Sequence, residues 1–165
     1  MQADGSEITE VVLSATRALV GIAARSLAEV SDDVSLAQYR VLVLVHGRGP
    51  QAMGDLAASL DVNPSTVTRV CDVLVEKRLI RRRTAPDNRR TVCAELTSRG
   101  RNLVDQVMER RRRLIEDALA AMTPQAQRQL ARSLEEFAAA AGEASDQAWT
   151  LGWSLEEARP RSSDR

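Results

Sequence analysis

The sequence predicts a mainly α-helical fold with a small β-hairpin wing, and three observations support this. Several separate segments have apolar residues at the three- and four-residue spacing of an amphipathic helix. Two short strand-like runs, 80–84 and 91–96, flank a turn-forming segment that contains Pro86, Asp87 and Asn88. The chain has 165 residues, 44% of them hydrophobic, which suits one compact unit with its own core or a small domain with dimerising helices.

The first helix is expected from about Glu7 to Val30. Residues 31–34 then break the helical pattern. The apolar residues of this helix keep helical spacing over a wide face, and they are Ile8, Val11, Val12, Ala15, Leu19, Ile22, Ala23 and Leu27.

A second helix is expected from Ser35 to about His46. Ser35 followed by Gln38 is a capping-box signal, in which each residue satisfies a backbone N–H of the first turn. The run 41–45 is apolar throughout and alone would suit a buried strand, but the cap favours a helix. A turn is expected at residues 47–50, which contain two glycines and a proline.

A helix-turn-helix is predicted from residue 54 onwards. Residues 54–60 form a short helical segment, after residues 51–53 that could add a strand to the hairpin. Residues 61–62 lead to Asn63 with almost no linker. The Asn63 side chain can cap a helix, and Pro64 at the first helical position loses no hydrogen bond. Two helices joined by so short a turn have helix-turn-helix spacing.

The helix predicted for residues 63–79 has two distinct faces. Its apolar face consists of Val67, Val70, Cys71, Leu74 and Val75. Its polar face consists of Ser65, Arg69, Asp72 and Glu76, with Thr68 on the flank. Small hydroxyls and one arginine near the N-terminus permit close approach to a phosphate backbone and hydrogen bonds to base edges. Taken alone, the same pattern also fits an ordinary amphipathic helix with a solvated face.

Positive charge is concentrated in residues 63–101, which have ten basic and four acidic side chains. The whole chain has 23 of each and no net charge, so it is not a general polyanion binder. A local basic segment is the electrostatic footprint expected for phosphate. The four aromatic residues lie outside this segment, which favours duplex DNA over single strands, where bases stack on aromatic side chains.

The order of helix, turn, helix and basic hairpin resembles a winged helix-turn-helix, and its details resemble the MarR family of bacterial transcriptional regulators. The resemblance covers about residues 8–140. The sequence departs from the family at Ala52, where Ser or Thr is the usual helix cap. The residues that carry the resemblance, in this order and spacing, are Leu56, Ala57, Pro64, Ser65, Thr66, Val67, Thr68, Arg69, Leu79, Arg82, Asp87, Arg89, Arg90, Leu96, Thr97 and Gly100.

The resemblance implies a homodimeric repressor that binds double-stranded DNA at an inverted repeat. Residues 7–30 and 97–142 are then dimerisation helices, and residues 35–96 are the winged helix-turn-helix lobe that binds DNA. Arg89 and Arg90 would reach from the hairpin towards a minor groove. The residues expected at the major groove are Pro64, Ser65, Thr66, Thr68 and Arg69.

Two further helices follow the hairpin. Thr97 can cap the first, whose arginines at 110–113 are expected on the solvent side. Thr123 and Pro124 can begin the second. A small lobe cannot cover the apolar faces of these two helices and of the helix at 7–30, so they need each other or a second copy. The apolar residues are Leu103, Val104, Val107, Met108, Leu114, Ile115, Ala118 and Leu119, then Leu130, Leu134, Phe137 and Ala141.

The C-terminal tail, residues 143–165, is expected to be partly disordered. Trp149 and Trp153 are one helical turn apart and could pack on the helical body. At the other end, the N-terminus lacks a positive segment, and the uncharged stretch 18–24 is too short to span a membrane. We therefore expect a cytoplasmic protein without a membrane partner.

No catalytic site, metal or cofactor is expected. His46 is the single histidine, and Cys71 and Cys93 form no C-x-x-C pair. A thiol-based redox regulator that binds DNA is the main alternative. Against it, Cys71 lies on an apolar face and Cys93 lies beside the carboxylate of Glu95, so neither favours a thiolate.

The effector is the least determined part of the prediction. The resemblance implies that a small aromatic compound can bind between the dimerisation helices and the DNA-binding lobe. Tyr39 is the candidate ligand-binding residue, although its apolar helix favours core packing. A structural winged-helix protein that binds another protein is a more distant alternative.

Overall fold

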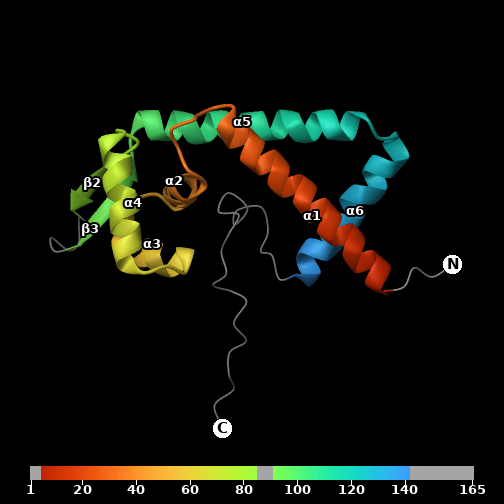
Figure 1. Cartoon of the computed structure of the whole chain (residues 1–165), viewed down its shortest axis with the longest axis horizontal. Helices are drawn as coiled ribbons and strands as arrows, with labels where there is room; N and C mark the ends of the chain where they lie inside the picture. Colours follow the sequence, from red (N-terminus) through yellow and green to blue (C-terminus); the bar gives the residue numbers. More distant parts are fainter. Residues whose placement is uncertain (1–4, 85–90, 142–165) are drawn as a thin grey trace, which may run out of the picture.

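The computed structural model describes residues 5–84 and 91–141 and confirms the predicted fold class. Helix α5 (Ser98–Ala120) extends along the molecule (Figure 1). Helices α2, α3 and α4 and the sheet lie at one end of it, and α6 (Pro124–Ala140) follows it at the other. Helix α1 (Gly5–Ala28) packs on α5. The predicted tail at 143–165, with Trp149 and Trp153, lies outside the described residues.

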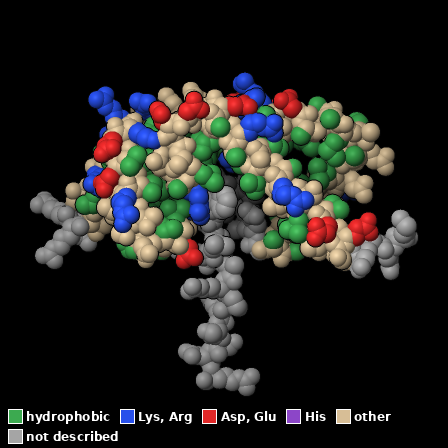
Figure 2. Space-filling view, viewed as in Figure 1, with side chains coloured by type: hydrophobic (Ala, Val, Ile, Leu, Met, Phe, Trp, Pro, Cys, Tyr) green, Lys and Arg blue, Asp and Glu red, His purple; other side chains and the backbone are tan. Residues whose placement is uncertain are grey.

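Helices α1 and α6 leave apolar side chains uncovered, as the sequence predicted. Figure 2 shows hydrophobic side chains spread among polar ones over the end of the molecule that these helices form. The core lies instead in the lobe and where α5 meets it. The large exposed apolar residues of the two helices are Ile8, Val11, Leu13, Leu19, Val20, Leu134 and Phe137.

Helix α1 also has the length and composition of a membrane-spanning helix. Among the described helices it is the one that passes this test, with a mean hydropathy of 1.4 in its most apolar window. The sequence prediction considered only residues 18–24 and so understated this property. A core helix of a soluble protein and a signal sequence pass the same test.

Helix α2 (Leu36–Arg48) begins with the predicted capping box. The Ser35 hydroxyl accepts a hydrogen bond from the Gln38 N–H, and the Gln38 side chain accepts one from the Ser35 N–H. The helix continues two residues beyond His46, so the predicted turn at 47–50 is shorter. Five of its residues are buried, Tyr39, Val41, Leu42, Leu44 and Val45, which explains the strand-like apolar run.

The helix-turn-helix consists of α3 (Met53–Leu60) and α4 (Pro64–Glu76). Asp61 lies between them with φ of +52°, in the left-handed region that Asp tolerates better than most residues. The N–H of Val62 then donates to the carbonyl of Ala57. At the start of α3, Ala52 provides no side-chain cap, as expected for an alanine.

Helix α4 ends at Glu76, so the prediction of helix to residue 79 was wrong. Arg78 takes the left-handed conformation, with φ of +58°. The N–H of Leu79 donates to the carbonyl of Leu74, which closes the helix end and turns the chain towards the sheet. On the apolar face Val67, Cys71 and Leu74 are buried, but Val75 is exposed.

The wing is a three-stranded antiparallel sheet in the order β1-β3-β2. Its strands are β1 (Gln51–Ala52), β2 (Ile80–Thr84) and β3 (Val92–Leu96). Ile80 pairs with Leu96 and Thr84 with Val92. The short strand predicted at residues 51–53 is therefore confirmed for residues 51–52, with β3 in the centre, while Met53 already begins α3.

Helix α5 begins directly after Thr97, as the predicted cap requires. The Thr97 hydroxyl accepts from the Gly100 N–H at 3.1 Å and donates to the Arg78 carbonyl at 2.7 Å. Helix α6 likewise starts after Thr123, whose hydroxyl accepts from the Ala126 N–H at 3.3 Å. Both predicted threonine caps are thus confirmed.

The arginine run 110–113 was predicted to face solvent, and this is only half correct. Arg112 and Arg113 are exposed, and both pair with Glu109 of the same helix. Arg110 instead pairs with Glu29, just beyond the end of α1. Arg111 lies over the Tyr39 ring, 6.0 Å from its centroid. This run therefore also holds α5 against α2 and the end of α1.

Candidate nucleic-acid interface

The polar face of α4 carries the side chains that the sequence predicted for a major groove. Pro64, Ser65, Thr66, Thr68 and Arg69 are all exposed. On the opposite side of the same helix, Val67, Cys71 and Leu74 are at most 1% exposed. The core therefore fixes the rotation of α4 about its axis and presents these five residues together.

The N-terminus of α4 differs from the prediction in its cap. Asn63 occupies the N-cap position, but its side chain makes no capping hydrogen bond. Its carbonyl accepts from the N–H groups of Thr66 and Val67. The Thr68 hydroxyl donates to the Pro64 carbonyl at 3.0 Å, so its oxygen remains as an acceptor towards the exterior.

Arg69 and Asp72 do not hold each other, although their spacing on α4 suggested that they could. Asp72 pairs with Arg82 of β2, with 2.5 Å between Asp72 Oδ1 and Arg82 Nη2. Arg69 makes no ion pair within the part of the chain that the structure describes. Its guanidinium is therefore available to a partner, and Arg82 connects the helix to the wing.

The stem of the wing carries three consecutive arginines, of which only Arg82 is among the residues that carry the family resemblance. Arg81 and Arg83 both pair with Glu95 of β3, at 2.8 Å and 3.8 Å. The Arg81 hydrogen bond, with the added charge of Arg83, holds the pKa of the Glu95 carboxyl below its usual range. The cross-strand position of residue 95 opposite residue 81 was the signal that could have revealed this cluster.

The tip of the wing, residues 85–90, lies outside the described residues. The predicted DNA contacts of Arg89 and Arg90 are in this segment. The strands that lead into it end at Thr84 and begin again at Val92, and these two residues are paired across the hairpin.

The turn that follows α4 makes close backbone contact with α5 at Gly100. A Cβ at this position would lie 2.0 Å from the carbonyl oxygen of Leu79, too close for any side chain. The N–H of Thr97 donates to the same Leu79 carbonyl at 3.0 Å. The junction therefore fixes Leu79, in the turn after α4, directly against the start of α5.

Tyr39, the predicted effector-binding residue, is buried in the core and is 3% exposed. Burial raises the pKa of its phenol, and the charge of Arg111 partly opposes this. Its hydroxyl has no hydrogen-bond partner among the described residues. Arg111, which sequence reasoning placed in solvent, is the residue beside it.

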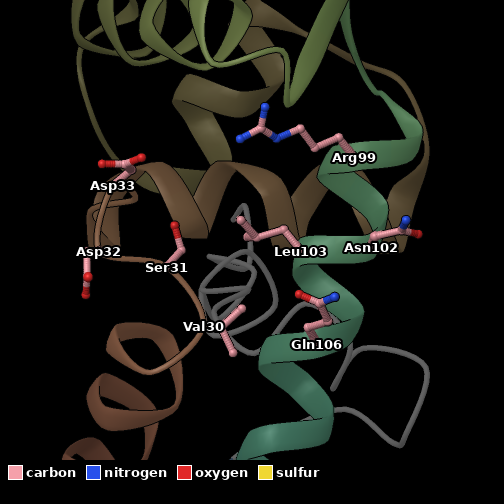
Figure 3. A pocket seen from close by; sticks show the side chains of 8 residues that line it. All are labelled: Val30, Ser31, Asp32, Asp33, Arg99, Asn102, Leu103 and Gln106. Atoms are coloured by element: carbon pink, nitrogen blue, oxygen red, sulfur yellow. The ribbon is translucent and has the colours of Figure 1, made fainter.

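An open cleft of about 740 Å³ lies between the α1–α2 connection and α5. Figure 3 shows the Arg99 side chain extending from α5 towards the connection that carries Asp33. Tyr39 does not line this cleft. Its lining is largely polar and consists of Val30, Ser31, Asp32, Asp33, Arg99, Asn102, Leu103 and Gln106.

Comparisons with known proteins agree with this geometry. The model of the MarR family matches residues 34–92. The crystal structure of RV1404 from Mycobacterium tuberculosis is similar, with 39% sequence identity and a TM-score of 0.81, over 87% of this chain and 98% of that one. MepR of S. aureus, in its F27L form bound to an oligodeoxyribonucleotide, shares the fold at 18% identity and a TM-score of 0.62, over 84% of this chain and 99% of that one.

Curated relatives match over a shorter region. YhbI of Bacillus subtilis, described as an uncharacterized HTH-type transcriptional regulator, is 36% identical over 74 residues, 45% of this chain. The chain spans only 48–60% of the length of the three curated relatives that it matches. The family match covers the helix-turn-helix and the wing as far as the first residue of β3. The similarity to RV1404 covers 87% of the chain and so extends well beyond that segment. On its sequence and its fold, this chain belongs to the MarR family.

Proposed function

We propose that this protein is a transcriptional regulator that binds double-stranded DNA with sequence specificity, as a homodimer on an inverted repeat. The observation that carries the proposal is the exposed row on α4, Ser65, Thr66, Thr68 and Arg69, whose helix is fixed by a buried opposite face. These side chains offer hydroxyls and a guanidinium with no ion-pair partner among the described residues, and such groups suit base edges and phosphates.

Two further observations support a DNA partner. MepR has the same fold and is bound to an oligodeoxyribonucleotide in its structure. Positive charge is concentrated in residues 63–101, which include α4 and the wing. In the proposed complex α4 enters the major groove, and Arg89 and Arg90 at the wing tip approach the neighbouring minor groove.

The homodimer is proposed because α1 and α6 expose apolar side chains that the monomer does not cover. A second copy would bury them, and it would place two recognition helices on one face of the duplex. We expect Leu19→Glu to convert the dimer to a monomer at micromolar concentration. Leu36→Glu is the matched control, because Leu36 is equally exposed but lies at the start of α2.

Light scattering of both variants tests the dimer. If the parent protein is a stable monomer, or if it partitions into membranes through α1, the homodimer proposal is wrong. The membrane outcome is tested by flotation with lipid vesicles, since α1 has the length and hydropathy to insert.

Binding to the DNA upstream of its own gene tests the proposed function. We expect footprints of two half-sites whose centres are about 10 base pairs apart, one helical turn of DNA. A scrambled duplex of equal length and base composition is the control. Equal affinity for both duplexes, or tight binding to a single half-site, would exclude sequence-specific recognition by a dimer.

We further propose that the protein is a repressor that a small aromatic compound releases from DNA. Support comes from the buried Tyr39 hydroxyl without a hydrogen-bond partner among the described residues, and from the Arg111 guanidinium beside it. In this proposal the core opens beside the buried Tyr39 to admit an aromatic carboxylate, which then satisfies both groups. We expect Tyr39→Phe to bind the operator as the parent does but to respond differently to a panel of aromatic acids. Unchanged responses would exclude Tyr39 from the effector site.

The thiol-based alternative has less support from the geometry. Cys71 is fully buried, and burial raises the pKa of its thiol to about 11. Cys93 is half-buried on β3. We expect a protein with both Cys71→Ser and Cys93→Ser to keep the parent's DNA binding and its response to peroxide. If the parent loses DNA on oxidation and this variant does not, the redox alternative is correct.

A further inference from the structure

The wing stem contains a charge cluster that lies outside the residues proposed to contact DNA and outside the core. Arg81 and Arg83 are exposed on the outer face of the sheet, with side chains 63% and 58% exposed. Glu95 lies opposite Arg81 on the central strand, and its side chain is only 18% exposed. A half-buried carboxylate thus lies between two exposed guanidiniums.

Both oxygens of the Glu95 carboxylate are engaged by this cluster. Oε2 accepts a hydrogen bond from Arg81 Nε at 2.8 Å, and Oε1 lies 3.8 Å from Arg83 Nη1. The charge of Arg101 on α5 acts on the same carboxylate. The third stem arginine, Arg82, is held by Asp72 on the other side of the strand. Every arginine of β2 therefore has a carboxylate partner.

These pairs lie close to the proposed DNA contact. Arg83 is two residues from the wing tip, and a strand advances about 3.3 Å per residue. In the proposed complex the stem arginines follow directly behind the tip, and their charge would act on the flanking phosphates over a range set by the Debye length, about 8 Å at physiological salt. Free arginines here would add phosphate contacts, which strengthen binding to any sequence.

We propose that Glu95 limits the sequence-independent affinity of this protein for DNA by holding Arg81 and Arg83 away from the phosphate backbone. The proposal rests on the proposed DNA-binding function. Glu95 is a positioning residue in this scheme, because it acts through the two arginines and touches no DNA. Its effect applies to operator and random DNA alike, because phosphates are the same in both.

Substitution of Glu95 by Gln tests the proposal. We expect affinity for a random duplex to rise about three- to tenfold at moderate salt, with a salt dependence steeper by roughly one per subunit. Operator affinity should rise by the same factor. If Glu95 had a purely structural role, the loss of its ion pairs would only weaken binding. The salt dependence would then not become steeper.

Glu109→Gln is the matched control. Glu109 also holds two guanidiniums, Arg113 at 3.0 Å and Arg112 at 4.0 Å, but in the middle of α5. The change in charge is identical, so an effect of net charge alone would appear in both variants. We expect Glu109→Gln to leave affinity and salt dependence unchanged.

Removal of the arginines completes the test. In a protein with Glu95→Gln, the added changes Arg81→Gln and Arg83→Gln should abolish the gain in affinity. Glu95→Met, which is similar in length, serves if the amide variant does not fold. The inference is wrong if folded Glu95→Gln or Glu95→Met binds random DNA no better than the parent, or if the gain persists without the arginines. If the parent binds no duplex at any salt concentration, the proposed function itself fails.

Discussion

Arg82 of the wing donates a hydrogen bond of 2.5 Å from Nη2 to Oδ1 of Asp72 in α4. The two side chains are about half exposed, so this ion pair contributes little to stability. Exposed pairs of this kind are typically worth below about 1 kcal/mol. Its effect is geometric, because it joins the two elements that are proposed to enter adjacent grooves.

The substitution Arg82→Gln should therefore lower operator affinity more than it lowers stability. We expect a loss of under about 1 kcal/mol in the free energy of unfolding, and a several-fold loss of operator binding. The charge swap Asp72→Arg with Arg82→Asp should restore part of the binding, because it restores the pair. Calorimetry measures stability, and fluorescence anisotropy measures operator affinity. If Arg82→Gln and the charge swap lose the same operator affinity, a positioning role is contradicted.

Arg69→Ala should relax the choice of sequence. The Arg69 guanidinium is exposed on the first turns of α4 and has no ion-pair partner in the described segments. Loss of a guanidinium that pairs with a guanine edge costs about 1–3 kcal/mol at the preferred site. Binding to random DNA should change much less. Competition titrations measure both, with Arg132→Ala on exposed α6 as the control.

Arg89→Ala should instead weaken binding to all sequences. A hairpin tip is held less rigidly than a helix, so its expected targets are the narrow groove and its phosphate walls. The salt dependence should fall by about one per subunit. Titrations at several salt concentrations measure this. Unchanged random-sequence binding with an altered base preference would show that the wing reads bases.

Gly100→Ala should strongly destabilise the protein. The added Cβ would lie 2.0 Å from the backbone oxygen of Leu79, which cannot move without shifting the end of α4. We expect a loss of about 3 kcal/mol or more. Gly54→Ala is the control, because nothing lies within 4 Å of its added Cβ. Denaturant melts give the free energy of unfolding of both variants. If Gly100→Ala is as stable as Gly54→Ala, the junction is flexible.

Cys71 should make stability depend on pH above neutrality. Burial raises the pKa of its thiol to about 11, above the unfolded value of about 8.5. The folded state therefore prefers the neutral thiol. This contribution is complete below about pH 8.5 and is lost as pH rises towards 11, by at most about 1.4 kcal/mol per pH unit. The stability advantage of the parent over Cys71→Ala should shrink in this window and stay constant below it.

The sequence predicted the fold well because its signals are local. Ser35 with Gln38, Thr97 and Thr123 each cap the helix that follows them. The cap expected from Asn63 fails because its carbonyl, and not its side chain, satisfies the first turn. The end of α4 was misplaced because the left-handed Arg78 has no sequence signal as strong as a glycine.

The candidate site was predicted less completely because its contacts join distant segments. Spacing on α4 suggested Asp72 as a partner for Arg69, while the fold brings Arg82 to it from β2. Arg111 was placed in solvent by its position in a basic run, whereas the packing of α5 on α2 directs it to Tyr39. These contacts depend on how helices and strands pack against one another, which helical periodicity alone does not determine.

The junction at Thr97 and Gly100 is the pivot for any change in the angle of α5, because the rest of this long helix extends from it. Helix α5 has 23 residues, so its axis is about 34 Å long. A rotation of about 5° at the pivot would carry the far end through about 3 Å, which is close to the 3.4 Å step between neighbouring base pairs. Close backbone contact at Gly100 leaves almost no slack for such a rotation. In the proposed dimer, the distance between the two α4 helices would therefore depend on this one small residue, far from the exposed apolar faces of α1 and α6.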